Sequence, residues 1–124
     1  MEPRRKYPRY EAKELPELQL RTLAGPIGEK LLNVSRGGCG FWAPFEDFQL
    51  RVGQGLRLQL KLDSKGSEFE IRGELLYVHP CPMESQIGRL YGIRFEAESK
   101  ELNDYIEAHE AEKSRDKKTQ QQRS

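Results

Sequence analysis

Two short groups of residues have the chemistry expected of an anion-binding site. The first is an arm near the N-terminus, where residues 1–10 carry four basic side chains and one acidic one, a local net charge of +3. Within it, Arg5 and Arg9 stand four positions apart. A planar guanidinium can bond two phosphate oxygens at once, or the O6 and N7 atoms of a guanine, which an ammonium group cannot do. The arm is therefore a candidate for binding phosphate or guanine.

The second group is a turn that reads Asn33-Val34-Ser35-Arg36-Gly37-Gly38. The Asn33 carboxamide and the Ser35 hydroxyl can donate to, or accept from, a guanine or its ribose. A glycine at position 38 would let the backbone approach a ligand without a Cβ in the way. The alternative is an ordinary turn, in which the Asn and Ser side chains bond their own backbone. Arg36 either contacts the ligand or is simply exposed to solvent.

Alternating apolar and polar residues predict the strands that must position these groups. The alternation is clearest over 56–62, where four leucines share one face. Further strands are expected at 18–22, 30–34, 39–43, 69–78 and 90–95. Pro80 and Pro82 lack backbone donors, so we expect the strand from 69 to end before them. The pattern predicts an all-β fold, a small antiparallel six-stranded barrel.

One helix is predicted after the last strand. Ser99 is a suitable N-cap, and the apolar stripe that follows at helical spacing consists of Leu102, Tyr105, Ile106 and His109. Beyond 110 no side chain larger than Ala111 is apolar, which predicts a disordered tail or a frayed helix. We therefore expect a flexible basic arm over 1–12, the barrel with its C-terminal helix over 13–110, and a polar, disordered tail over 111–124.

Composition argues against several classes of function. The chain has 124 residues, enough for one domain, and a net charge of +1 makes it a poor general polyanion binder, so no DNA or RNA partner is expected. No apolar run approaches the roughly 18 residues of a membrane span, which predicts a cytoplasmic protein without membrane insertion. Two cysteines and two histidines predict no metal site. Because no carboxylate pair or triad has a meaningful spacing, we expect neither catalytic residues nor an enzyme.

The remaining noteworthy side chains are first expected to have structural roles. Trp42 is expected to pack in or beside the core. Tyr77 is expected to do the same, with a position near a guanine as the alternative. Cys39 is expected to be a small buried residue rather than a nucleophile, because no base lies at a suitable spacing. The two histidines, at 79 and 109, are expected at the surface.

Together, RRxxxR at the start of the chain and (D/N)xSxxG some twenty residues later, in an all-β context, resemble the PilZ domain family. Members of this family are bacterial receptors for the second messenger cyclic di-GMP. The resemblance covers residues of about 4 to 108 and includes the paired glycines at 37 and 38, the strand at 91–95 and the closing helix. It implies a PilZ-like β-barrel with a C-terminal α-helix.

The resemblance also implies roles for individual residues. Arg5 and Arg9 would grip phosphate and guanine, and the second guanine would be held by residues of the turn, Asn33, Ser35, Gly37 and Gly38. In the family, an arginine at the position of Arg4 tends to accompany an intercalated ligand dimer, which implies two ligands per chain.

The function implied is that of a sensor with no cofactor other than its ligand. Cyclic di-GMP would order the arm against the barrel, and the new surface would signal to an unidentified downstream protein. One alternative is a PilZ-like scaffold that binds a protein but no nucleotide. Another is a small barrel that binds single-stranded nucleic acid, which would call for aromatic and basic side chains interleaved along a groove.

Overall fold

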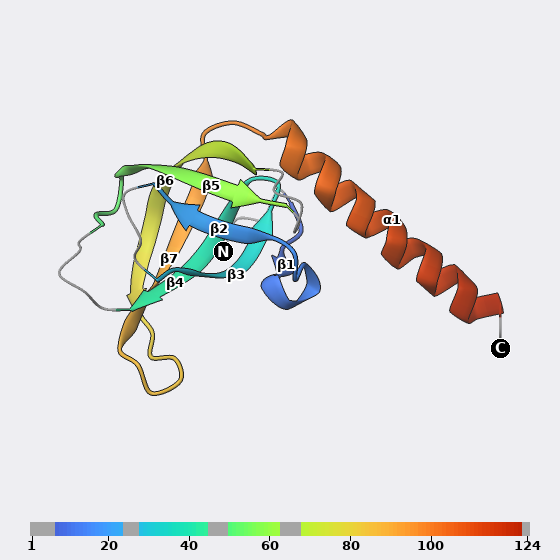
Figure 1. Ribbon diagram of the computed structural model, residues 1–124, viewed down its shortest axis with the longest axis horizontal. Coiled ribbons are helices and arrows are strands. Elements are labelled where there is room, and N and C mark those ends of the chain that lie inside the picture. The colour runs from blue at the N-terminus through green and yellow to red at the C-terminus, as the bar shows by residue number, and fades with distance from the viewer. Residues whose placement is uncertain (1–6, 24–27, 45–49, 63–67, 123–124) are drawn as a thin grey trace, which may run out of the picture.

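The computed structural model describes residues 7–23, 28–44, 50–62 and 68–122. Its elements are β1 (Tyr10–Glu11), the 3-10 turn η1 (Ala12–Glu14), β2 (Gln19–Thr22), β3 (Lys30–Ser35), β4 (Gly38–Pro44), β5 (Gly55–Lys61), β6 (Glu68–Pro80), β7 (Gly88–Phe95) and α1 (Lys100–Gln122). The expected all-β fold with a C-terminal helix is confirmed (Figure 1). Within the described ranges the sheet has seven strands rather than six, because the two-residue strand β1 precedes those that were predicted.

All seven strands belong to one antiparallel sheet, in the order β1-β3-β4-β7-β6-β5-β2. The sheet curls, so that β2 at one edge returns toward β3 near the other edge (Figure 1). At this approach the backbone N–H of Thr22 donates to Oε1 of Glu29 over 3.0 Å. The result is a half-barrel with its apolar side chains inside.

The period-two alternation of β5 builds much of this core. Leu58 and Leu60 are completely buried, whereas Arg57, which precedes them, and Arg21 on the neighbouring strand β2 are exposed. Across β5 and β6, Arg57 forms an ion pair of 2.6 Å with Glu70. Trp42 on β4 is buried as expected, and its Nε1 donates to a backbone carbonyl over 2.6 Å.

The strand β6 extends through Pro80, although we expected the prolines to end it. Pro80 remains paired with Arg89 of β7, and the next residue, Cys81, donates its N–H to the Gly88 carbonyl over 2.9 Å. Because N–H groups of a strand alternate between its two sides, position 80 faces away from β7. On that side of β6 no residue of β5 lies opposite position 80. The antiparallel strand β5 begins at Gly55, which pairs with Glu74, and continues toward the other end of β6. The missing donor of Pro80 therefore costs no ladder bond.

The helix α1 begins as predicted and continues further than predicted. Ser99 caps it, because the Leu102 N–H donates to the Ser99 hydroxyl over 3.3 Å. Leu102 and Ile106 are fully buried and belong to the core cluster. Past the expected end near 110 the helix runs to Gln122, since the sequence there lacks Gly and Pro and is rich in strong helix formers. Its far end lies well away from the sheet (Figure 1).

The two cysteines differ in their environments. Cys39 on β4 is 6% exposed, and its burial raises the pKa of the thiol to about 12. Cys81 is only half-buried. We expect a thiol reagent such as DTNB at pH 8 to modify one thiol per native chain quickly and both in denaturant, because the thiolate is the reactive form. The Cys81→Ser variant should lose the fast reaction; two fast thiols in the native protein would contradict this account.

Candidate ligand-binding site

One cavity brings the basic arm and the turn together. Its volume is about 590 Å³, within the range of small-molecule sites. Of the predicted site residues, those on its wall are Arg9, Asn33, Ser35, Arg36, Gly37, Gly38 and Tyr77. The other two predicted arginines, Arg4 and Arg5, lie outside the described residues. Thus the arm and the turn share one face of the barrel, as a common ligand requires.

The arm is attached to the barrel from Tyr7 onward. Tyr7 packs its ring against Gly37, where an added Cβ would lie 3.0 Å from Cδ2, and donates its hydroxyl to Glu98. Two residues beyond, Arg9 is exposed on the cavity wall, and within the described part of the chain its guanidinium has no ion-pair partner. The flexible arm over 1–12 stays a prediction; in its described part, these contacts join the arm to the barrel and place Arg9 on the cavity wall.

The turn between β3 and β4 is held by its own side chain. The Ser35 hydroxyl accepts the Gly37 N–H over 3.2 Å and donates to the Gly38 carbonyl over 3.5 Å. The Gly37 carbonyl in turn accepts the N–H of Phe95 at the end of β7 over 2.9 Å. The ordinary turn that we considered as the alternative is therefore present. Its presence is compatible with binding, because a hydroxyl oxygen has two lone pairs and Ser35 stands on the cavity wall.

The reason that we gave for a glycine at position 38 differs from what the structure shows. A Cβ on Gly38 would lie 2.2 Å from the carbonyl oxygen of Ile93 on β7. Strand packing alone therefore requires the glycine, and its role in ligand approach stays a prediction. Behind the turn, a Cβ on Gly40 would lie 3.0 Å from Oδ1 of Asn33, so the missing side chain at 40 leaves room for the Asn33 carboxamide.

Tyr77 faces the cavity instead of the core, and core packing, our first expectation, is wrong. The register of β6 against β7 shifts between Leu75, which pairs with Ile93, and Tyr77, which pairs with Gly92. This bulge adds one residue to β6 and inverts the alternation after Leu75. The Tyr77 ring covers Gly92, where an added Cβ would lie 2.1 Å from Cε1 of Tyr77. The same ring stacks on the His79 ring, with the two ring centroids 5.0 Å apart.

Two other arginines on the cavity wall, Arg94 and Arg36, are already paired with carboxylates. Arg94 bonds Glu74 over 2.6 Å. Arg36 bonds Glu110 of α1 over 2.6 Å, and this bond raises the pKa of the Arg36 guanidinium and lowers the pKa of the Glu110 carboxyl. Burial, followed by the bond to Glu110, raises the pKa of Tyr10 to about 12. Sequence reasoning missed Glu110, because it stands 74 positions after Arg36 and no local pattern joins them.

The second histidine is also part of this region. His109 was expected at the surface but is half-buried, edge-on to the Tyr10 ring with centroids 5.5 Å apart. Its Nε2 atom is buried and has no hydrogen-bond partner among the described residues. Neither histidine joins a metal-binding group, since no three His, Cys, Asp or Glu side chains of the described ranges are arranged to hold an ion. In the same ranges no helix is long and apolar enough to span a membrane.

Comparisons with known proteins agree with this architecture. A solved structure of the Bacillus subtilis inhibitor of motility (MotI/DgrA) superimposes with a TM-score of 0.66 at 17% identity, over 91% of this chain and 53% of that one. The chain thus spans about half the length of that protein, and at this identity the likeness shows the fold. No curated protein matches. The family model of the PilZ domain matches residues 3–109, most of the chain, and the protein therefore belongs to the PilZ domain family.

Proposed function

We propose that this protein is a non-catalytic receptor for cyclic di-GMP. PilZ domains generally are receptors for this nucleotide. The observation that carries the proposal is that one cavity, of about 590 Å³, has on its wall Arg9 of the arm together with Asn33 and Ser35 of the turn. These are the residue types that recognise phosphate, guanine and ribose.

The residues on this wall include types that bond phosphate and guanine. Cyclic di-GMP carries two phosphodiesters and two guanines. The guanidinium of Arg9, which has no ion-pair partner among the described residues, can bond a phosphate or a guanine edge bidentately. A bidentate contact contributes about 1–3 kcal/mol of discrimination, while micromolar affinity needs about 8 kcal/mol. Several contacts are therefore needed, so the proposed site includes Arg4 and Arg5. The Tyr77 ring supplies a stacking surface of about 1–3 kcal/mol per base.

Binding also provides a signal. The basic side chains that precede Tyr7 repel one another, and a dianionic ligand removes that repulsion. The ligand therefore draws this part of the arm over the cavity, which creates a new surface for a downstream protein. With an arginine at position 4, we propose that the ligand binds as an intercalated dimer.

Isothermal titration calorimetry with cyclic di-GMP tests the proposal. We expect micromolar or tighter binding by the wild type, at least tenfold weaker binding by Arg9→Ala because about 1.4 kcal/mol corresponds to a factor of ten, and none by Arg5→Ala/Arg9→Ala. Arg21→Ala, which removes an exposed arginine on β2, is the matched control and should bind normally. The molar ratio distinguishes one ligand from two.

No heat from the wild type at tens of micromolar ligand would contradict the receptor function and favour the protein-binding scaffold. Displacement of cyclic di-GMP by an arbitrary single-stranded oligonucleotide, with strong salt dependence, would instead favour the nucleic-acid binder.

A further inference from the structure

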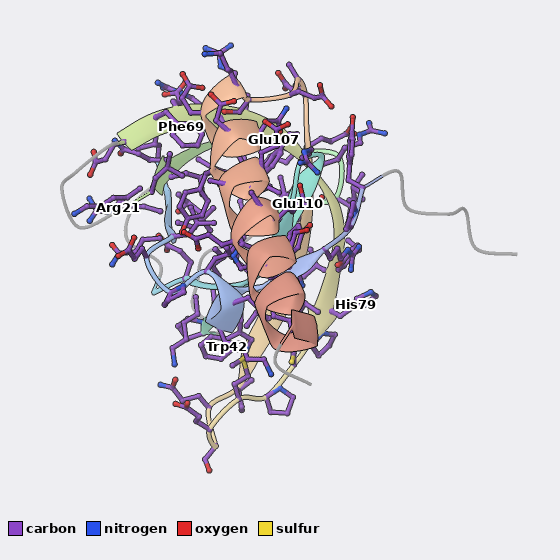
Figure 2. All side chains as sticks on the ribbon, turned by 90° about the vertical axis from the view of Figure 1, so that its right-hand side faces the viewer. Arg21, Trp42, Phe69, His79, Glu107 and Glu110 are labelled. Carbon is purple, nitrogen blue, oxygen red and sulfur yellow. The ribbon has the colours of Figure 1, made fainter. Side chains whose placement is uncertain are left out.

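A polar cluster joins the cavity wall to the helix α1. Arg36 and Glu110 form their 2.6 Å ion pair in a sheltered place, with side chains 20% and 36% exposed. The other carboxylate oxygen of Glu110 accepts the hydroxyl of Tyr10, on the strand that follows Arg9. One carboxylate on the helix therefore holds both the turn and the arm. Glu110 lies on the flank of α1 opposite Arg21 and Phe69 (Figure 2).

The second half of α1 depends on this cluster for its position. Up to Ile106 the helix is anchored by fully buried side chains. From 107 to 114 no described side chain is fully buried, and the contacts with the barrel come from His109, Glu110 and Lys113, which reach Tyr10, Arg36 and Glu14. Polar contacts of this kind are individually weak, because water competes for them. This part of the helix can therefore detach locally while the barrel remains folded.

Arg36 stands between two anionic partners. It lines the cavity proposed for cyclic di-GMP, and its Nη2 bonds Glu110. A phosphate that bonds the two-pronged edge containing Nη2 needs the N–H that Glu110 accepts, so in that geometry it displaces the carboxylate. Ligand and helix thus compete for one side chain.

We propose that bound cyclic di-GMP takes Arg36 from Glu110 and thereby releases the part of α1 beyond Ile106. The inference rests on the proposed receptor function and adds to it a second ligand-dependent element, separate from the arm. Linkage requires the coupling to be reciprocal: if the ligand weakens the docking of the helix, the docked helix weakens the binding of the ligand. Glu110 is then a residue that lowers ligand affinity without touching the ligand.

Calorimetry on Glu110→Gln measures this reciprocity. The substitution removes the charge that competes for Arg36, so cyclic di-GMP should bind about fivefold more tightly, the lower end of typical coupling between sites. Glu112→Gln removes an exposed carboxylate from the same helix and should leave the affinity unchanged. Circular dichroism of both variants establishes that they fold alike.

Hydrogen–deuterium exchange of the full chain supplies the structural readout. In the wild type, saturating cyclic di-GMP should accelerate exchange of amides 107–122 and leave those of 100–106 unchanged; in Glu110→Gln, 107–122 should exchange faster even without ligand. If the wild type binds but the two glutamine variants share its affinity, or if 107–122 is unaffected by ligand, the coupling is wrong while the receptor function stands. If the wild type does not bind, both are wrong.

Discussion

Replacing Gly38 with alanine is expected to lower the free energy of unfolding by about 3 kcal/mol, although it adds one methyl group. The added Cβ would lie 2.2 Å from the carbonyl oxygen of Ile93. This neighbour is backbone in the middle of a paired strand and cannot rotate away, so β4 and β7 must separate locally. Their pairing, Gly38 with Arg94 and Cys39 with Ile93, lies beside the cavity.

Urea unfolding of the wild type, Gly38→Ala and Gly55→Ala checks this prediction. Gly55 is the matched control, because a Cβ there has nothing within 4 Å, and its midpoint should be unchanged or slightly higher. If Gly38→Ala were as stable as the wild type but failed to bind cyclic di-GMP, the glycine would serve ligand approach instead. The experiment thus separates two roles that one motif residue can have.

Ile106→Ala is the second substitution with a large expected effect, a loss of about 3 kcal/mol. The Ile106 side chain is 0% exposed to solvent. It belongs with Leu102 to the core cluster. Truncation to alanine removes buried apolar surface and leaves a space that the rigid barrel end cannot fill. Because these two side chains anchor α1, helix content should fall in the same transition.

Thermal unfolding followed by circular dichroism measures the loss, with Ile87→Ala as the control. Ile87 is 77% exposed, so the same chemical change should alter stability by no more than about 0.5 kcal/mol. Equal effects of the two substitutions would mean that α1 is not anchored by its first turns. The coupling proposed through Glu110 would then be contradicted, because it requires the first turns of α1 to stay anchored while the part beyond Ile106 is released.

Local patterns predicted most of the fold. The alternating leucines of β5 and the Ser99 cap of α1 depend only on residues that are close in sequence. Both expectations are confirmed. The hypothesis that the arm and the turn form one site stays a prediction, and it is supported by Arg9 and Ser35 lining the same cavity.

The features that were missed depend on contacts distant in sequence. β1 exists because Tyr10 pairs with Val34, and two residues show no periodicity by themselves. The Arg36–Glu110 pair forms only once α1 has docked across the end of the barrel. Pro80 is accommodated because a neighbouring strand ends early, which depends on the register of three strands. Single-residue signals contain none of this information.

The extra residue in β6 has a consequence for the breadth of the cavity wall. In a regular strand, consecutive side chains point to opposite faces, so one face shows only every other residue. At the bulge, Leu76 and Tyr77 follow one another and both line the cavity. The side chains of Leu76 and Tyr77 thus form an apolar strip about twice as wide as the strip that a regular strand, with one side chain in two on this face, would form. Deleting Leu76 would narrow that strip while Tyr77 and Val78 kept their directions.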